Sequence, residues 1–216
     1  GSEKIAGMME KRYRSLGGTI EFFKTVKSID RRGRRARGVT CEDGSSYHAD
    51  IVVSSTDLYS TIHHLLPGVP RPQKFVKKFA RYRPFTALHQ ISLGIARTFE
   101  GEAEKLNIPA DPPIRLAEEN AHDMMVRILN FDQSFAPKGK TSVVVQLRTE
   151  EWKHWVDLRK NDRETYKKEK ARIAEAVIKV LERRFGNIRK KVEVVDVATP
   201  ATYVRYTGSY HGAHQG

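Results

Sequence analysis

The chain has 216 residues, of which 39% are hydrophobic and 30% charged, a composition typical of a globular protein with a polar surface. No apolar run approaches the roughly 20 residues that a transmembrane helix requires. Cys41 is the single cysteine, which excludes an internal disulfide and a cysteine-based zinc cluster and leaves cytoplasm as the default location.

The charge is strongly positive, because 39 Lys and Arg stand against 26 Asp and Glu for a net +13. Such a balance suits binding to nucleic acid or to an anionic membrane surface. The basic residues are dispersed over several stretches, whereas a nucleic-acid module concentrates them and interleaves aromatic side chains. Dispersal therefore favours an ordinary solvated surface, with its acidic counterpart elsewhere in a longer protein.

Residues 1–57 predict one helix followed by short strands. Apolar residues recur at helical spacing from Ile5 to Leu16, and Gly17-Gly18 ends the helix. Arginine-rich residues 30–35 predict a hairpin tip, and Asp43-Gly44 predicts a second tight turn. Ile51-Val52-Val53 is a continuous apolar run, which is typical of a strand buried on both faces. The predicted strands cover residues 19–29, 36–41, 46–48 and 51–53.

The remainder predicts longer elements. Residues 99–120 are acidic and contain prolines, and we expect them to form a surface excursion between two strands. The predicted helices cover residues 58–66, 73–80 and 162–184. The predicted strands cover residues 84–96, 124–131, 141–149 and 191–198. A few long strands with helices on one side define an α+β layer.

Short motifs also occur in a fixed order along the chain. They are Gly17-Gly18-Thr19, Thr25-Val26-Lys27-Ser28-Ile29, Gly38-Val39 before Asp43-Gly44, Ala49-Asp50-Ile51-Val52-Val53-Ser54, Ala136-Pro137-Lys138-Gly139-Lys140, Ala198-Thr199-Pro200 leading to Arg205-Tyr206-Thr207-Gly208, and Gly212-Ala213. Together they resemble the phytoene-desaturase-like, carotenoid and retinoid oxidoreductase branch of the FAD-dependent amine-oxidase superfamily. The resemblance spans nearly the whole chain.

This resemblance implies an internal fragment of a larger flavoenzyme. It implies that residues 1–57 belong to a Rossmann-like flavin domain, that residues 58–198 form a substrate-binding domain with a mixed or antiparallel sheet, and that residues 199–216 are a tail leading back to the flavin domain. The glycine-rich G-x-G-x-x-G turn that holds the FAD pyrophosphate in this family has no match here. We therefore expect FAD in the parent protein but not on this chain alone.

The implied function is hydride transfer to or from an apolar, polyene-type substrate similar to a carotenoid or retinoid, with this chain supplying the substrate-binding domain. The alternative is a basic binding module for nucleic acid or an anionic membrane surface. The basic stretch from Lys74 to Arg83 fits a peripheral membrane contact under both hypotheses. Nucleic acid is not expected as a partner.

The resemblance implies three cofactor-binding positions. Val26 corresponds to the strand that passes the adenine end of FAD, although a core valine is the plain alternative. Ser55 and Thr56 follow the predicted buried strand, where ligands of open sheets collect. Capping of the next helix is an equally good role for Thr56. The catalytic residues are not identifiable from the sequence.

Other reactive side chains favour structural roles. His63 and His64 are adjacent on a helix, so their side chains diverge and no metal site is expected. His211 and His214 fall in a tail that we expect to be disordered, the alternative being a position facing the reactive ring of the flavin in a complete enzyme. Cys41 is expected to be a packed residue and Asp50 a residue at a strand edge.

Overall fold

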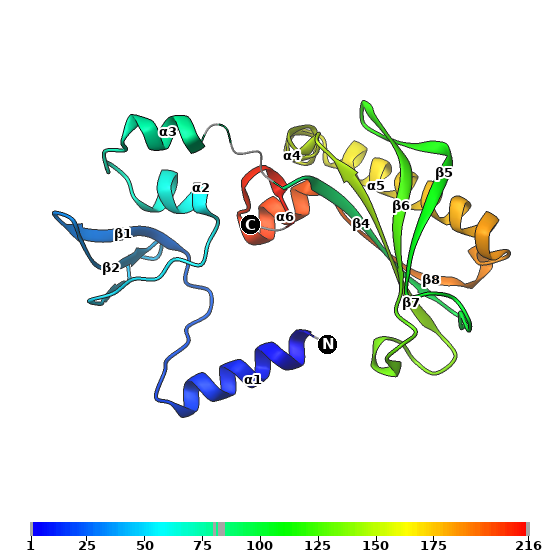
Figure 1. Ribbon diagram of the computed structural model, residues 1–216, viewed down its shortest axis with the longest axis horizontal. Coiled ribbons are helices and arrows are strands. Elements are labelled where there is room, and N and C mark those ends of the chain that lie inside the picture. The colour runs from blue at the N-terminus through cyan, green and yellow to red at the C-terminus, as the bar shows by residue number, and fades with distance from the viewer. Residues whose placement is uncertain (1, 80, 82–84, 215–216) are drawn as a thin grey trace. The chain divides into compact units, whose positions relative to one another are not determined.

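Figure 1 shows the computed structural model, which describes residues 2–79, 81 and 85–214. Contacts divide the chain into two compact units. The first contains Gly1–Ser55 and Thr61–Pro70, and the second contains Thr56–Ser60 and Arg71–Gly216.

The first unit contains a helix, a small antiparallel sheet and one turn of π-helix. Its elements are α1 (Ser2–Ser15), β1 (Val26–Arg32), β2 (Arg35–Cys41), β3 (Ser46–His48) and η1 (Thr61–Leu65), with strand order β1-β2-β3. The helix and both predicted turns are confirmed. The first strand begins at Val26 and not at residue 19, because Phe23 has a left-handed backbone (φ 60°) that interrupts an extended chain.

The predicted buried strand at residues 51–53 is wrong for this structure. These residues adopt no strand conformation, and the side chains of Ile51 and Val53 are 79% and 85% exposed. A strand buried on both faces needs a hydrogen-bonded neighbour on each edge. Among the described residues, no strand pairs with this segment. The apolar residues 51–53 therefore lack the neighbouring strands that would bury them in this part of the chain.

The second unit is built on a five-stranded antiparallel sheet of order β5-β6-β7-β4-β8. Its strands are β4 (Ala87–Ile95), β5 (Lys105–Leu116), β6 (Glu119–Ile128), β7 (Thr141–Thr149) and β8 (Val192–Ala198). Its helices are α2 (Leu58–Ser60), α3 (Gln73–Phe79), α4 (Trp152–Asn161), α5 (Arg163–Phe185) and α6 (Pro200–Thr207). Three short helical turns complete it: η2 (Gln133–Phe135), η3 (Arg189–Lys191) and η4 (Tyr210–Gly212).

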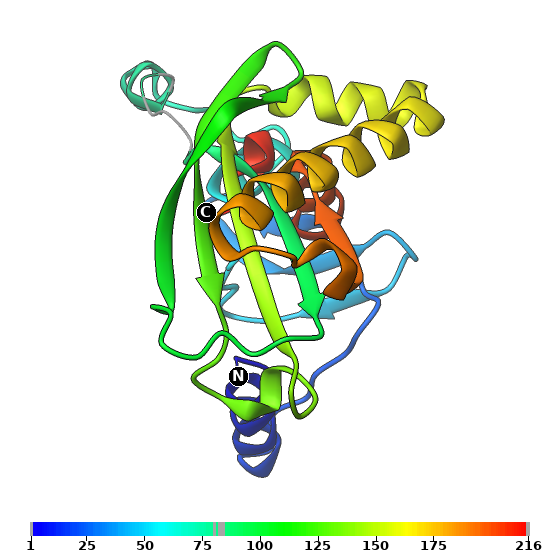
Figure 2. The same ribbon diagram turned by 90° about the vertical axis from the view of Figure 1, so that its right-hand side faces the viewer.

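The core lies between the sheet and α5, which crosses one face of it (Figure 2). Asp162 begins α5 by accepting a hydrogen bond from the backbone N–H of Thr165, and Gly186, with φ 64°, ends it. Alternate residues of β4 and β7 meet this helix, as the period of a half-buried strand requires. The apolar stripe of α5 that faces the sheet includes Ile173, Val177 and Leu181. The α+β class with a helix packed on one face is confirmed.

Residues 99–120 correct a further expectation, because most of them form strand β5. The strand lies at the edge of the sheet and contains Pro109, Pro112 and Pro113. Proline has no N–H to donate to a ladder, so a sheet tolerates it mainly at an edge. Its register with β6 is interrupted between Pro109 and Ile114. The prolines therefore mark an edge strand and not a loop.

Two helices were not predicted. Helix α4 fills part of the interval before α5, and α6 lies in the tail that we expected to be disordered. A capping box at Thr199 and Thr202, with Pro200 in the first turn, begins α6. Residues 58–66 divide into α2 and the π-helical turn η1. Residues 80 and 84, at the ends of two predicted elements, lie outside the described residues.

Candidate functional site

The face of the sheet opposite α5 carries both polar and apolar side chains. Directly paired residues of antiparallel strands share a face. The pairs Gln90–Gln146, Ser92–Val144 and Gly94–Ser142 therefore lie together. Gln146 Nε2 donates to Gln90 Oε1 at 3.2 Å. We call this surface the open face; it comprises Gln90, Ser92, Gly94, Met125, Arg127, Ser142, Val144, Gln146, Val194 and Asp196, which are half-buried or exposed.

An apolar groove of about 320 Å³ lies on the open face across β4, β7 and β8. Its walls include Val144, Val194, Phe135 and Pro137. Gly94 and Val194 both line the groove, and a Cβ added at Gly94 would lie 3.2 Å from the Cβ of Val194. Lys140, Glu193 and Asp196 also line the groove, but most of its exposed surface is apolar, which suits an apolar ligand.

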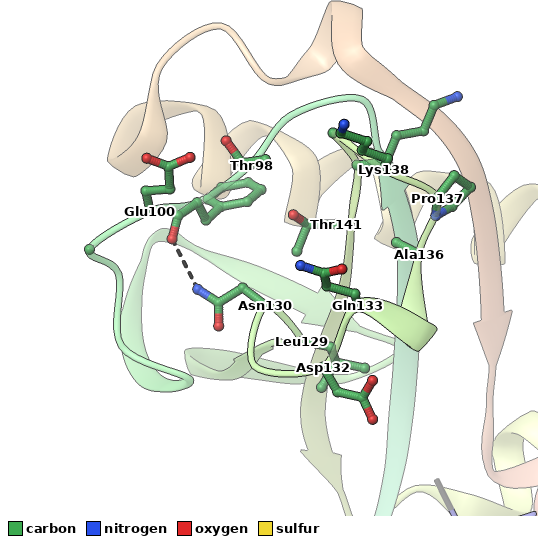
Figure 3. A pocket seen from close by; sticks show the side chains of 14 residues that line it. Thr98, Glu100, Leu129, Asn130, Asp132, Gln133, Ala136, Pro137, Lys138 and Thr141 are labelled. Carbon is green, nitrogen blue, oxygen red and sulfur yellow. Dashed lines mark hydrogen bonds between the residues drawn. The ribbon is translucent and has the colours of Figure 1, made fainter.

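A larger cavity of about 770 Å³ lies at one end of the sheet (Figure 3). We call it the end pocket; three connections line it, at residues 98–101, 129–133 and 136–141. Asn130 Nδ2 donates to the carbonyl of Phe99 at 3.0 Å and joins two of them. The third contains the motif Ala136-Pro137-Lys138-Gly139-Lys140, which forms a turn closed by a hydrogen bond from Lys140 N to Pro137 O at 3.0 Å.

The end pocket and the apolar groove share a wall, formed by Ala136, Pro137, Lys140 and Thr141. Lys140 is held in this wall by an ion pair with Glu193 at 2.6 Å. The rest of the end pocket has a mixed lining, with the apolar side chains of Phe99 and Leu129 beside polar ones such as Glu100, Asn130 and Lys138.

The tail after β8 is ordered up to residue 214, which corrects the expectation of disorder. Asp57 accepts hydrogen bonds from the backbone N–H of Ser60 and of Tyr210, at 2.9 and 3.1 Å. Further on, Nδ1 of His214 lies 3.0 Å from the carbonyl of Thr86, and Ala213 forms a β-bridge with Ala87. The tail is thus attached both to α2 and to the start of β4.

Four rings stack in a column at this attachment. Tyr59 stacks on Tyr210 at 3.9 Å between centroids, Tyr210 on His211 at 3.8 Å, and His211 on Trp152 at 4.3 Å. His211 adopts a left-handed backbone (φ 58°) to reach this position. Burial lowers the pKa of His211, while Asp57 opposes that change. The column gives His211 a defined place that its tail position in the sequence did not indicate.

The predicted cofactor-binding residues lie as follows. Val26 begins β1, is half-buried and pairs with Cys41. Ser55 is exposed in the segment after residues 51–53, within the same unit. Thr56 is exposed and directly precedes Asp57, the residue that caps α2. Cys41 is buried, as expected of a packed residue. Asp50 is exposed and lies beside Arg37 and His48 in a shallow pocket.

The described residues do not form a complete dinucleotide site. A pyrophosphate cradle is a strand, a glycine-rich turn and a helix whose N-terminal amides face the ligand. Within residues 2–79, 81 and 85–214, Gly17-Gly18 follows a helix and precedes an irregular segment, which is the reverse order. In the same residues, no cluster of three or more His, Cys, Asp or Glu side chains is placed to hold a metal. None of the described helices combines the length and apolarity needed to cross a bilayer.

Comparisons with known proteins agree on the class. The family model for flavin containing amine oxidoreductases matches residues 1–212. A 1-hydroxycarotenoid 3,4-desaturase of Flavobacterium is 24% identical over 100% of this chain and 43% of its own length. The phytoene desaturase of Phycomyces blakesleeanus is 26% identical over 86% of this chain, and the human all-trans-retinol 13,14-reductase is 27% identical over 100% of it. The last two are covered over 33% and 40% of their lengths.

Solved structures show the same fold. An oxidoreductase of Methanosarcina mazei superposes with a TM-score of 0.63 and 18% identity, over 99% of this chain and 49% of that one. A protein of Pyrococcus furiosus superposes with a TM-score of 0.52 and 14% identity, over 92% and 42%. At these identities the two superpositions establish a shared fold. The chain belongs to the flavin containing amine oxidoreductase family, and it spans less than half the length of the relatives named here.

Proposed function

We propose that this chain supplies the substrate-binding side of an FAD-dependent oxidoreductase that transfers hydride to or from an apolar, polyene-type molecule. Family membership supports the coarser statement, an FAD-dependent oxidoreductase. The observation that carries the finer one is the apolar groove on the open face. Its walls offer Val144, Val194 and Phe135 to a ligand. The printed names of the relatives, desaturases of carotenoids and a reductase of retinol, are consistent with such a substrate.

The groove's contribution is orientation and exclusion of water. Hydride transfer is chemistry that FAD supplies when bound, whereas the protein fixes where the reacting carbon lies. Burying an apolar chain against valine and phenylalanine side chains removes water from both surfaces, at about 25 cal/mol per Å². No catalytic acid or base is needed at the groove for this role.

A charge placed in the groove tests the proposal in the parent enzyme. Val144→Glu puts a carboxylate where the substrate would lie, and we expect turnover of polyene substrates to fall about tenfold or more with flavin content unchanged. Val195→Glu is the matched control, because Val195 pairs with Leu93 on the other face of the sheet and is 47% exposed. Equal activity of the Val144→Glu variant and wild type would contradict the proposal.

Within this function, Val26, Ser55 and Thr56 are proposed to contact FAD in the parent protein. Val26 offers backbone groups at the start of β1, and Ser55 and Thr56 are exposed. Ser55→Ala and Thr56→Ala are expected to weaken flavin retention in the parent enzyme, measured by the absorbance of bound flavin. Substitution of Ser46, an exposed serine of β3, serves as the control.

A peripheral membrane contact at α3 is proposed as well. Phe75 and Val76 are 38% and 48% exposed, and Lys74 and Lys77 flank them on the same helix. Exposed apolar side chains beside lysines suit an anionic bilayer surface. We expect Lys74→Gln with Lys77→Gln to reduce sedimentation with phosphatidylserine vesicles, and no change with phosphatidylcholine vesicles. Binding to oligonucleotides instead would favour the nucleic-acid alternative.

A further inference from the structure

The hairpin of β1 and β2 (Figure 1) concentrates positive charge without matching carboxylates. Residues 30–37 contain a single aspartate and five exposed arginines, which are Arg31, Arg32, Arg34, Arg35 and Arg37. The carboxylate of Asp30 accepts hydrogen bonds from the hydroxyls of Ser28 and Thr40. None of the ion pairs formed by the described residues includes an arginine of this hairpin. The positive charge is therefore available to a ligand.

The register of the hairpin brings like charges together. Arg32 and Arg35 are directly paired across β1 and β2, so their side chains share a face, and two like charges in such a pair destabilise a sheet. The register shifts after Asp30, which makes Arg37 the extra residue of a β-bulge. Charged side chains also protect a sheet edge from other chains, but that role requires no particular geometry. Breaking a local rule of sheet stability is typical of a functional site.

The bulge lies at a pocket of about 500 Å³ in the first unit. The pocket is lined by Arg32, Arg37, His48, Ala49 and Asp50. A hydrogen bond from Ala49 N to Arg37 O at 2.9 Å joins the bulge to the end of β3. Asp50 is the carboxylate of this lining, and it forms no ion pair with Arg32 or Arg37. Two guanidinium groups from different strands thus line one pocket without an ion pair.

From this arrangement we propose that the pocket binds a phosphate monoester group. A guanidinium is a planar fork that donates to two oxygens at once. A carboxylate has oxygens for one fork, whereas a phosphate monoester has three terminal oxygens and can accept from both Arg32 and Arg37. Its charge of about −2 also offsets the repulsion by Asp50. Soluble phosphorylated molecules and some lipid headgroups carry this group, and the experiment distinguishes these two sources.

Titration with inorganic phosphate tests the site on the chain itself, with binding followed by the NMR signal of the Ala49 amide. In Arg32→Gln with Arg37→Gln we expect the dissociation constant to rise about tenfold or more, because both forks are lost. Lys11→Gln with Arg12→Gln removes the same charge from exposed positions of α1, outside the pocket, and should change it by less than about twofold. Arg37→Lys keeps the charge without the fork and should raise it about threefold to tenfold.

A variant with the opposite effect keeps the test independent of folding. Asp50→Asn removes the negative charge from the lining, and we expect the dissociation constant for phosphate to fall about twofold to fivefold. Tighter binding cannot result from a damaged fold. An unchanged or higher dissociation constant in this variant would contradict a phosphate site beside Asp50.

Vesicle sedimentation identifies the source of the phosphate. Phosphatidic acid has a phosphate monoester headgroup and phosphatidylserine does not, so phosphatidylcholine vesicles containing one or the other are compared at equal charge. For a lipid ligand, Arg32→Gln with Arg37→Gln should reduce sedimentation with phosphatidic acid vesicles only. For a soluble ligand, it should weaken phosphate binding and leave both sedimentations unchanged. Unchanged phosphate affinity in this variant, or no phosphate binding by wild type together with an equal effect on both vesicles, would overturn the inference.

The proposed function does not depend on this site, because the apolar groove belongs to the second unit.

Discussion

His89 is a buried histidine on β4 whose ring contributes packing and no hydrogen bond. Its ring meets Trp155 edge-on at 4.5 Å, and among the described residues both of its ring nitrogens and the Trp155 Nε1 lack a hydrogen-bond partner. Burial lowers the pKa of His89 to about 3, and the charge of Arg172 acts in the same direction. The side chain is therefore neutral in the folded protein at physiological pH.

This burial predicts a loss of stability in acid. The unfolded chain takes up a proton at His89 near pH 6.5, whereas the folded protein resists it down to about pH 3. The free energy of unfolding should then fall with decreasing pH across this window, by at most about 1.4 kcal/mol per pH unit. In His89→Phe, urea unfolding at about pH 7 and about pH 5 should show a smaller difference than in wild type. His122→Phe, on the exposed side of β6, should keep the wild-type difference.

Gly38 is a position in β2 that only glycine fits. Its φ is 152°, and an added Cβ would lie 2.0 Å from the carbonyl oxygen of Tyr47 on β3. Gly38→Ala should therefore destabilise the three-stranded sheet by about 1–3 kcal/mol. Gly7→Ala in α1 should act in the opposite direction by about 0.5–1 kcal/mol, because a Cβ there meets nothing within 4 Å. Thermal unfolding followed by circular dichroism would measure both effects as changes in the melting temperature. Equal changes in the melting temperature of the two variants would contradict the steric argument.

At the scale of elements, α5 stabilises the second unit through one apolar stripe. Ile173 and Val177 are fully buried against the sheet, while Lys179 on the same helix is exposed. Truncation at Ile173 removes methyl groups from a packed core and leaves a cavity. We expect Ile173→Ala to lower the free energy of unfolding by about 2–5 kcal/mol, measured by urea denaturation. Lys179→Ala should change it by less than about 0.5 kcal/mol.

Edge and tail segments show how context determines an element. Residues 105–116 contain three prolines, which the sequence alone made typical of a loop, yet they pair with β6 as an edge strand. The tail gains order from contacts far away in the sequence, above all the bond from Tyr210 N to Asp57. In both cases the deciding partner is distant, so local composition could not identify the outcome.

At the scale of the whole molecule, family membership and cofactor retention are separate properties. The family implies FAD in the parent enzyme, and the described residues contain no pyrophosphate cradle. We expect this chain, purified alone, to be colourless and to retain no flavin. The absorbance of a heat-released supernatant measures this directly. A yellow preparation with flavin near one equivalent per chain would contradict the expectation and would locate a binding site within these residues.

The α+β fold and most elements were predictable from the sequence, including β7 at residues 141–149 and the long helix α5, and the ordered motifs indicated the family by resemblance. These follow from local periodicity, capping residues and the ordered motifs at Gly17-Gly18, residues 136–140 and residues 198–208. Three features became visible only in the structure: Ile51-Val52-Val53 has no paired neighbour among the described residues, β5 is an edge strand, and His89 is buried. The tertiary structure also decided that the apolar groove and the end pocket share a wall. Such facts depend on which distant segments meet, and a linear pattern records the chemistry of each segment but not its partners.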